Sequence, residues 1–381
     1  MLNKSNLSSI LSVLLPIAGV AVIIFLGYKV LGNFGVVNTK ATLSADSEYG
    51  EAQVLVDGKE VGTTPINGLE VNSGENKVRM ENDHITYEVV IDFLAKPSRT
   101  FEVALVRDLG VSEVFSAGKN LWFKEKDSSS ILSVISDPDE ATVYVDNNKV
   151  GTTPFSTSEL TPGEYTLRVT KAGYESQSSR ISIDEDYQLN VSTKLFPQPV
   201  SSTVSTLADS TNIYDVASDN SLITSDPQDW ADAIIYWNQT RGIELSGVGL
   251  NKELVFDYFI DYNGNVYGEQ GDQVQSADEL GSVQKGAYLR RISEGPGLSD
   301  AAKQALETFE ILGGKTATIN FTGTGWLNVR STPSLNGDIL TKADVGNSYS
   351  VLEESNDWVK IKVSEDVQGW VSGTYVTITE Q

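Results

Sequence analysis

A fourteen-residue run, Ala52-Gln-Val-Leu-Val-Asp-Gly-Lys-Glu-Val-Gly-Thr-Thr-Pro65, recurs 89 positions later as Ala141-Thr-Val-Tyr-Val-Asp-Asn-Asn-Lys-Val-Gly-Thr-Thr-Pro154. The register continues without a gap, and 13 of the 30 residues from 52 to 81 are identical to their counterparts. Apolar and polar residues alternate in each copy, and Asp57-Gly58 or Asp146-Asn147-Asn148 supplies the residues that a hairpin turn needs. The chain therefore contains a duplicated β domain, and we expect two small β-sandwiches at 33–107 and 131–197.

The repeated motif continues in the second copy with a Pro-Gly-Glu turn at 162–164 and with Ala172-Gly173-Tyr174. These residues and the Val-Gly-Thr-Thr-Pro runs resemble the PEGA domain of bacterial and archaeal envelope proteins, over about 41–107 and 131–196. The first copy departs from the pattern, with Ser73 in place of the proline and His84 in place of the glycine. The resemblance implies a sandwich fold and an envelope location, and it implies no catalytic role.

Two segments connect the expected domains. Residues 108–130 include Phe115, Leu121, Trp122 and Phe123, which are too apolar for a flexible linker, so we expect this connector to pack on a sandwich. Residues 198–210 are rich in Ser, Thr and Pro, and we expect a linker there.

The last domain, 315–381, contains short alternating strands that are separated by turn residues. Its motifs occur in the order Leu327-Asn-Val-Arg-Ser331, Trp358-Val-Lys360, Gly369-Trp-Val371 and Tyr375. This order resembles the bacterial SH3 domain over about 318–379. The resemblance implies a small β-barrel that binds peptidoglycan or its peptides.

Alternation in the strand around Trp358 predicts the ligand contacts of this domain. It places Val359, Ile361 and Val363 on the core face, and an aromatic beside two cations on the other face, where an acidic wall peptide could bind. Burial of the aromatics in the barrel is the alternative. The predicted ligand-binding residues are Trp326, Trp358, Lys360, Lys362, Trp370 and Tyr375.

The acidic region 211–314 has the pattern of a small α+β domain. A helix is expected after Asp226-Pro227, a hairpin around Asn263-Gly264, and a second helix after Ser299. Asp261-x-Asn263-x-Asn265 predicts a turn and not a calcium loop, because Gly264 stands fourth where such a loop needs glycine sixth. Residues 254–267 are weakly similar to N-acetylmuramoyl-L-alanine amidase domains, but Asp257 stands where these have a zinc-binding histidine.

Composition argues against catalysis and against a cofactor. The chain has no cysteine and one histidine, His84, so no cysteine nucleophile and no zinc site of several histidines can be built. The formal net charge of −24 argues against a nucleic-acid partner, because phosphate binding needs basic patches, and we predict none. We predict no catalytic residue and no metal site. An amidase-like or glycosidase-like wall enzyme with its site in 211–314 stays open as an alternative.

The N-terminal segment has no charged residue from Ser5 to Tyr28, which is long enough for a helix that crosses a bilayer. We expect residues 1–32 to form a cytoplasmic tip and a retained anchor, with residues 7–28 in the lipid. The sequence thus predicts a mainly β, multidomain, single-pass membrane protein with its modules outside the membrane. Its expected function is adhesion to the cell wall. Besides the enzyme alternative above, a second alternative is a scaffold whose PEGA-like domains bind other envelope proteins.

Overall fold

The computed structural model describes residues 40–379, except 84, 127–130, 201–202, 208–209, 211, 247–248, 252–255, 281–284, 310, 312–315 and 365–366. The chain divides into two compact units at Gln198–Pro199, and each is described by itself. The predicted anchor and His84 lie outside the described residues. Within the described part, no helix combines the length and the apolar character that crossing a membrane requires.

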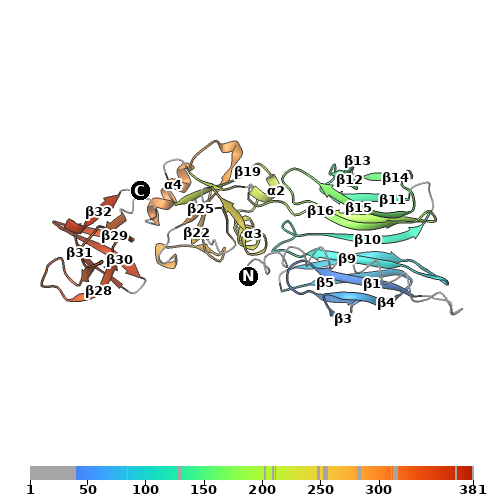
Figure 1. Ribbon diagram of the computed structural model, residues 1–381, viewed down its shortest axis with the longest axis horizontal. Coiled ribbons are helices and arrows are strands. Elements are labelled where there is room, and N and C mark those ends of the chain that lie inside the picture. The colour runs from blue at the N-terminus through green and yellow to red at the C-terminus, as the bar shows by residue number, and fades with distance from the viewer. Residues whose placement is uncertain are drawn as a thin grey trace, which may run out of the picture. The chain divides into compact units, whose positions relative to one another are not determined.

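The first unit is built on one seven-stranded sheet that both repeats share. Its order is β14-β11-β17-β10-β9-β1-β4. The strands are β14 (Phe155–Thr157), β11 (Leu132–Asp137), β17 (Tyr187–Lys194), β10 (Ala117–Glu125), β9 (Glu102–Asp108), β1 (Lys40–Ser47) and β4 (Ile66–Asn72). β10 lies between the first repeat, drawn in blue, and the second, drawn in green (Figure 1).

Each repeat adds a four-stranded sheet of its own. In the first repeat the order is β3 (Lys59–Thr63), β2 (Gln53–Val56), β5 (Gly74–Glu81) and β6 (Thr86–Phe93). In the second it is β13 (Asn148–Thr152), β12 (Thr142–Val145), β15 (Gly163–Thr170) and β16 (Gln177–Ile183). A short hairpin of β7 (Ala95–Lys96) and β8 (Arg99–Thr100) follows the first of these sheets.

The expected hairpins are present, and their geometry explains why both repeats have an aspartate at the same turn position. Asp57 and Asp146 both adopt positive φ in the turn. The carboxylate of Asp57 accepts a hydrogen bond from the amide of Lys77 at 2.9 Å, and that of Asp146 accepts one from the amide of Thr166 at 2.8 Å. Each aspartate therefore ties its hairpin to the neighbouring strand.

The two four-stranded sheets cover opposite faces of the shared sheet, as consecutive residues of β10 show. Asn120 donates to the hydroxyl of Tyr87 in the first repeat at 2.6 Å, whereas Lys119 donates to the carbonyl of Ser178 in the second at 2.7 Å. Successive side chains of a strand point to opposite faces. Accordingly Trp122 packs on the first core and Leu121 belongs to the second. The expected apolar connector is thus a central strand, and the repeats are halves of one body, not separate modules.

Two buried cations lie on β9 and β10, the paired strands where the two repeats meet. The guanidinium of Arg107 stacks on the ring of Tyr87 at 3.7 Å, and Lys119 is 6% exposed with Glu48 3.7 Å away. Burial lowers the pKa of both cations. Because a buried charge is costly without partners, these contacts favour a single arrangement of the strands that carry them.

The second unit begins with an α+β domain. Its sheet has the order β18 (Ser205–Thr206), β19 (Ile213–Ser218), β25 (Gly286–Arg291), β22 (Tyr258–Asp261), β23 (Val266–Gly268) and β24 (Gln273–Val274). β19, β25 and β22 are parallel. The helices are α2 (Ser221–Thr224), α3 (Pro227–Thr240) and α4 (Asp300–Thr308), with short 3-10 turns at Ala277–Glu279 and Ile292–Glu294 and a small ribbon of β20 (Ile243–Leu245) and β21 (Gly249–Asn251). Asp226 and Ser299 cap α3 and α4 as expected.

The segment expected as a linker packs onto this domain instead. Val200, Val204 and Leu207 are 6%, 0% and 7% exposed, and β18 joins the sheet. The carbonyl of Pro199 accepts a hydrogen bond from the indole of Trp230 at 2.7 Å. Its Ser, Thr and Pro content suggested flexibility, but its apolar residues Val200, Val204 and Leu207 are buried.

The last domain is the expected small SH3-like β-barrel. Its order is β28 (Ile339–Asp344), β27 (Trp326–Arg330), β31 (Val367–Ser372), β30 (Trp358–Ser364), β29 (Ser348–Ser355), β26 (Thr316–Ile319) and β32 (Val376–Thr379), with a 3-10 turn at Gly373–Tyr375. Its core is lined by Ala317, Ile319, Val329, Ala343, Val359, Ile361 and Val371.

Candidate functional site

The outer face of the C-terminal sheet carries the residues that the sequence nominated. In β30, Val359 and Ile361 are 3% and 0% exposed in the core. Trp358, Lys360 and Lys362 occupy the alternate positions and are half-buried on the other face. The alternation expected for this strand is therefore present.

The nominated aromatics differ in exposure. Trp370 lies opposite Lys360 and Arg330 in the sheet but is only 8% exposed, so little of its ring is available to a ligand. Tyr375, in the 3-10 turn, is 43% exposed, and Trp326, at the start of β27, is 38% exposed. The structure does not gather all six residues into one site.

An aromatic–cation pair does exist, at a position that the sequence analysis missed. The ammonium of Lys342 lies 3.9 Å from the ring centroid of Trp326. The two side chains share a face because Trp326 pairs with Asp344, and Asn328 pairs with Lys342, across the β27–β28 hairpin. The register of the β27–β28 hairpin brings these residues together, but the eight-residue loop 331–338 between the strands separates them in the linear sequence.

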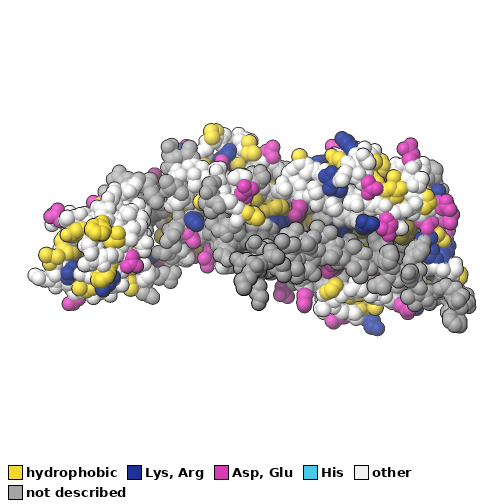
Figure 2. Space-filling view, in the orientation of Figure 1, with side chains coloured by type: hydrophobic (Ala, Val, Ile, Leu, Met, Phe, Trp, Pro, Cys, Tyr) yellow, Lys and Arg dark blue, Asp and Glu magenta, His cyan; other side chains and the backbone are white. Residues whose placement is uncertain are grey.

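Exposed apolar side chains accompany this pair. Leu335, Ile339 and Leu340 are 76%, 54% and 49% exposed along the loop and the start of β28, and Phe321, before β27, is 83% exposed. Figure 2 shows hydrophobic side chains and cations together on the visible face of this domain. Clustered exposed apolar residues mark binding surfaces more often than single ones do. We call the outer side chains Trp326 and Lys342 the hairpin surface.

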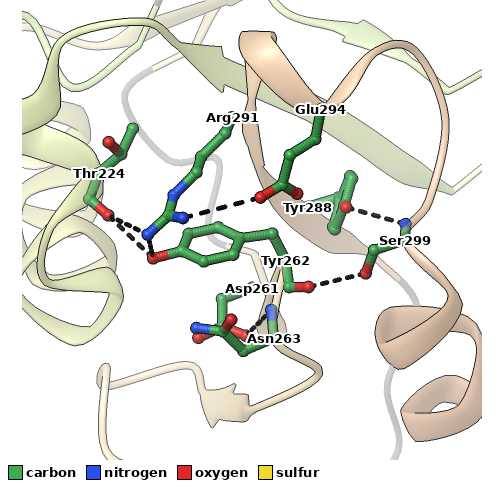
Figure 3. Close-up of polar contacts among 8 residues, drawn as sticks. All are labelled: Thr224, Asp261, Tyr262, Asn263, Tyr288, Arg291, Glu294 and Ser299. Carbon is green, nitrogen blue, oxygen red and sulfur yellow. Dashed lines mark hydrogen bonds and ion pairs between the residues drawn. The ribbon is translucent and has the colours of Figure 1, made fainter.

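A second group of polar side chains lies at the carboxyl ends of β22 and β25, the edge at which open parallel sheets usually bind ligands (Figure 3). Arg291 stacks on the ring of Tyr262, with its guanidinium carbon 3.6 Å from the centroid, and donates to the Tyr262 hydroxyl. That hydroxyl in turn donates to the carbonyl of Thr224 at 2.9 Å, and the Ser299 hydroxyl donates to the carbonyl of Tyr262 at 2.8 Å. These contacts fasten α2 and α4 to the sheet.

Asp261 is fully buried in this group and has its acceptor capacity filled. It accepts hydrogen bonds from the amides of Asn263 and Asn265 at 2.8 and 2.9 Å, and from the Asn265 side chain at 2.9 Å. The Tyr267 hydroxyl adds a fourth at 3.1 Å, and burial together with the Asp261 charge raises the pKa of Tyr267, which keeps it a donor. The turn expected here is therefore a self-contained network, and its carboxylate is committed to the turn.

Asp257, which stands at the zinc-ligand position of the amidase pattern, has a structural contact. Its carboxylate accepts a hydrogen bond from the amide of Lys285 at 2.7 Å. Across the described ranges, no three Asp, Glu, His or Cys side chains come together in a way that could hold a metal ion.

Comparisons with known proteins match three segments of the chain to two families. Residues 40–106 and 129–199 match the PEGA domain, and residues 324–377 match the bacterial SH3 domain, which confirms both resemblances within a few residues of the expected bounds. The chain is also 35% identical over 80 residues to "Putative N-acetylmuramoyl-L-alanine amidase YrvJ" of Bacillus subtilis (strain 168). That match covers 21% of this chain and 15% of that protein. No solved structure matches the chain.

Proposed function

We propose that this protein attaches to the cell wall through its C-terminal SH3-like domain and catalyses no reaction. The observation that carries the proposal is the exposed Trp326–Lys342 pair within a domain that matches the bacterial SH3 domain. An aromatic ring beside a cation suits a ligand that offers both apolar groups and carboxylates, as wall peptides do. The likeness to a protein named as an N-acetylmuramoyl-L-alanine amidase supports the same polymer, because that amide joins peptide to glycan in peptidoglycan.

We expect the detergent-solubilised full-length chain to sediment with purified peptidoglycan. Trp326→Ala should weaken this binding by about 1–2 kcal/mol, the range for an exposed aromatic contact with a neighbouring cation. Binding isotherms from sedimentation at rising peptidoglycan concentration measure the effect. Leu352→Ala is a matched control, because Leu352 is 45% exposed in the same domain but lies on β29.

Two results would contradict this proposal, and one further variant tests the contact predicted from the sequence. Absence of the unmodified chain from the pellet would reject wall binding. Equal losses for Trp326→Ala and Leu352→Ala would move the site away from the hairpin surface. Trp358→Ala tests the ligand contact that the sequence predicts on β30, since Trp358 has Lys360 and Lys362 on its own face of the sheet.

The proposed lack of catalysis is supported by the hydrogen bonds of Asp261, the fully buried carboxylate of the acidic domain, which accepts four of them within its turn. We expect no new amines and no reducing sugars after prolonged incubation of the full-length chain with peptidoglycan. An authentic amidase and a lysozyme serve as positive controls. Either product at a rate proportional to protein concentration would establish the amidase-like or glycosidase-like alternative.

The proposal includes a membrane anchor at residues 7–28, supported by the absence of charge from Ser5 to Tyr28. The modules would then lie outside the membrane and hold the wall, with tethering raising the effective concentration of a weak binder. N-terminal sequencing of the membrane fraction and protease treatment of spheroplasts test the anchor and its orientation. A mature start near Gly32, or modules protected from protease, would contradict this part of the proposal.

A further inference from the structure

The strand β28 forms one edge of the C-terminal sheet and leaves main-chain groups available. It pairs with β27 and with no other described strand. The amide of Val345 donates to the carbonyl of Gly325 at 3.0 Å, in the register that also opposes Leu327 to Ala343. Because only alternate pairs of antiparallel strands exchange hydrogen bonds, the N–H and C=O of Lys342 point away from β27, toward the open edge.

The side chains along this edge protect it only in part, because the outward amide of Asp344 donates to the Tyr349 hydroxyl at 3.3 Å. Native edges are usually blunted by proline, by bulges or by many charges. β28 has one register shift, near Arg330 and Ile339, and Ile339 and Leu340 remain about half exposed. Its single cation, Lys342, lies against Trp326, and no ion pair is described for Lys342 among the placed residues. The other edge strand, β32, is shorter, and none of its large apolar side chains is highly exposed.

We propose that an extended peptide bearing a carboxylate adds to this sheet along β28. Its main chain would hydrogen-bond to the N–H and C=O of Lys342, its carboxylate would approach the Lys342 ammonium, and an apolar group would contact Trp326. Strand addition is an established way for an exposed sheet edge to bind a peptide.

This inference rests on the proposed function and specifies which part of the wall polymer is bound. Consecutive amides present an N–H and a C=O at the spacing of a β-strand, which a sugar chain does not. The cation at the centre of the edge favours an acidic partner, although the domain from 315 to 381 has a net charge of −3. Attraction is therefore local to Lys342, and the ligand is the peptide and not the glycan.

The test uses the full-length chain and purified peptidoglycan cleaved by an authentic N-acetylmuramoyl-L-alanine amidase, which separates free peptides from glycan strands. Each fraction is titrated against the chain. We expect the peptides to bind and the glycan strands not to bind. Lys342→Ala should weaken peptide binding about 2–5-fold through loss of the cation. Lys342→Pro should weaken it at least a further ~5-fold, because it also removes the outward N–H while leaving the β27 ladder intact.

Hydrogen exchange supplies a measurement that does not depend on the proline variant folding. Exchange over residues 339–344 should slow when peptide is added to the unmodified chain, because the Lys342 amide gains an acceptor. Equal affinity of the Ala and Pro variants with native melting curves, unchanged exchange, or binding of the glycan alone would each overturn strand addition. Sedimentation with intact wall would still stand in those cases, whereas its absence would reject the proposed function separately.

Discussion

Leu167→Ala is expected to destabilise both repeats, although Leu167 belongs to the second. Its side chain is 2% exposed in the second core, and removing it should cost about 2–5 kcal/mol. β10 pairs with β17 of the second repeat over eight residue pairs and with β9 of the first over five. Loss of the second core should therefore release β10 and with it the first sandwich. We expect both repeats to unfold in one transition.

Hydrogen exchange resolved by peptide separates the repeats and tests this coupling. Residues 40–106 and 131–198 should both exchange faster in Leu167→Ala, and the free energy of opening should fall by the same amount in both. Leu306→Ala is the matched control, because Leu306 is fully buried in α4 of the other unit and should leave both repeats unchanged. Faster exchange confined to 131–198 would mean that the repeats are energetically independent despite the shared sheet.

The sharing of a sheet could not be read from the repeat itself. Local alternation and the Asp-containing turns predicted the strands of each copy, because both depend on residues close together in sequence. The strands that pair with β10 are distant from it in sequence, so local patterns do not identify them. Leu121 and Trp122 are both apolar and adjacent, and the sequence does not show that they face different cores. Apolar content showed that the segment is buried but not which sheet it joins.

The candidate site shows the same limit. The core face of β30 followed from alternation within one strand. The Trp326–Lys342 pair needs the register of a hairpin whose loop offers no tight two-residue turn signal, so it emerged only with the fold. Conversely, Trp370 follows a glycine as Trp326 does, yet its strand lies between β27 and β30, and it is buried.

The segment 199–207 was misjudged for a related reason. Its polar composition is typical of linkers, whereas its three buried apolar residues and its bond to Trp230 decide its structure. A spacing of three or four residues between Val200, Val204 and Leu207 carries no helical meaning here, because Ser205–Thr206 is a strand. Long-range contacts overrode the local signal.

Trp230 therefore offers the second large expected effect. It is fully buried on α3, among the largest such side chains of the described residues, and its indole N–H donates to the carbonyl of Pro199. Trp230→Ala should lower the free energy of unfolding of the α+β domain by about 3–5 kcal/mol through the cavity it leaves. The carbonyl of Pro199 would also lose its partner, at a further cost of about 1 kcal/mol.

Trp230→Phe separates packing from the hydrogen bond. It keeps an aromatic ring in the core but removes the donor, so it should cost distinctly less than the alanine variant while still loosening the segment 199–207. Urea titration followed by hydrogen exchange of residues 199–207 and of α3 measures both effects. A loss below about 1 kcal/mol for Trp230→Ala would contradict full burial, since such truncations cost several times more in packed cores. Equal exchange of 199–207 in the phenylalanine variant and the unmodified chain would show that burial of Val200, Val204 and Leu207, and not the Pro199 hydrogen bond, holds this segment to the domain.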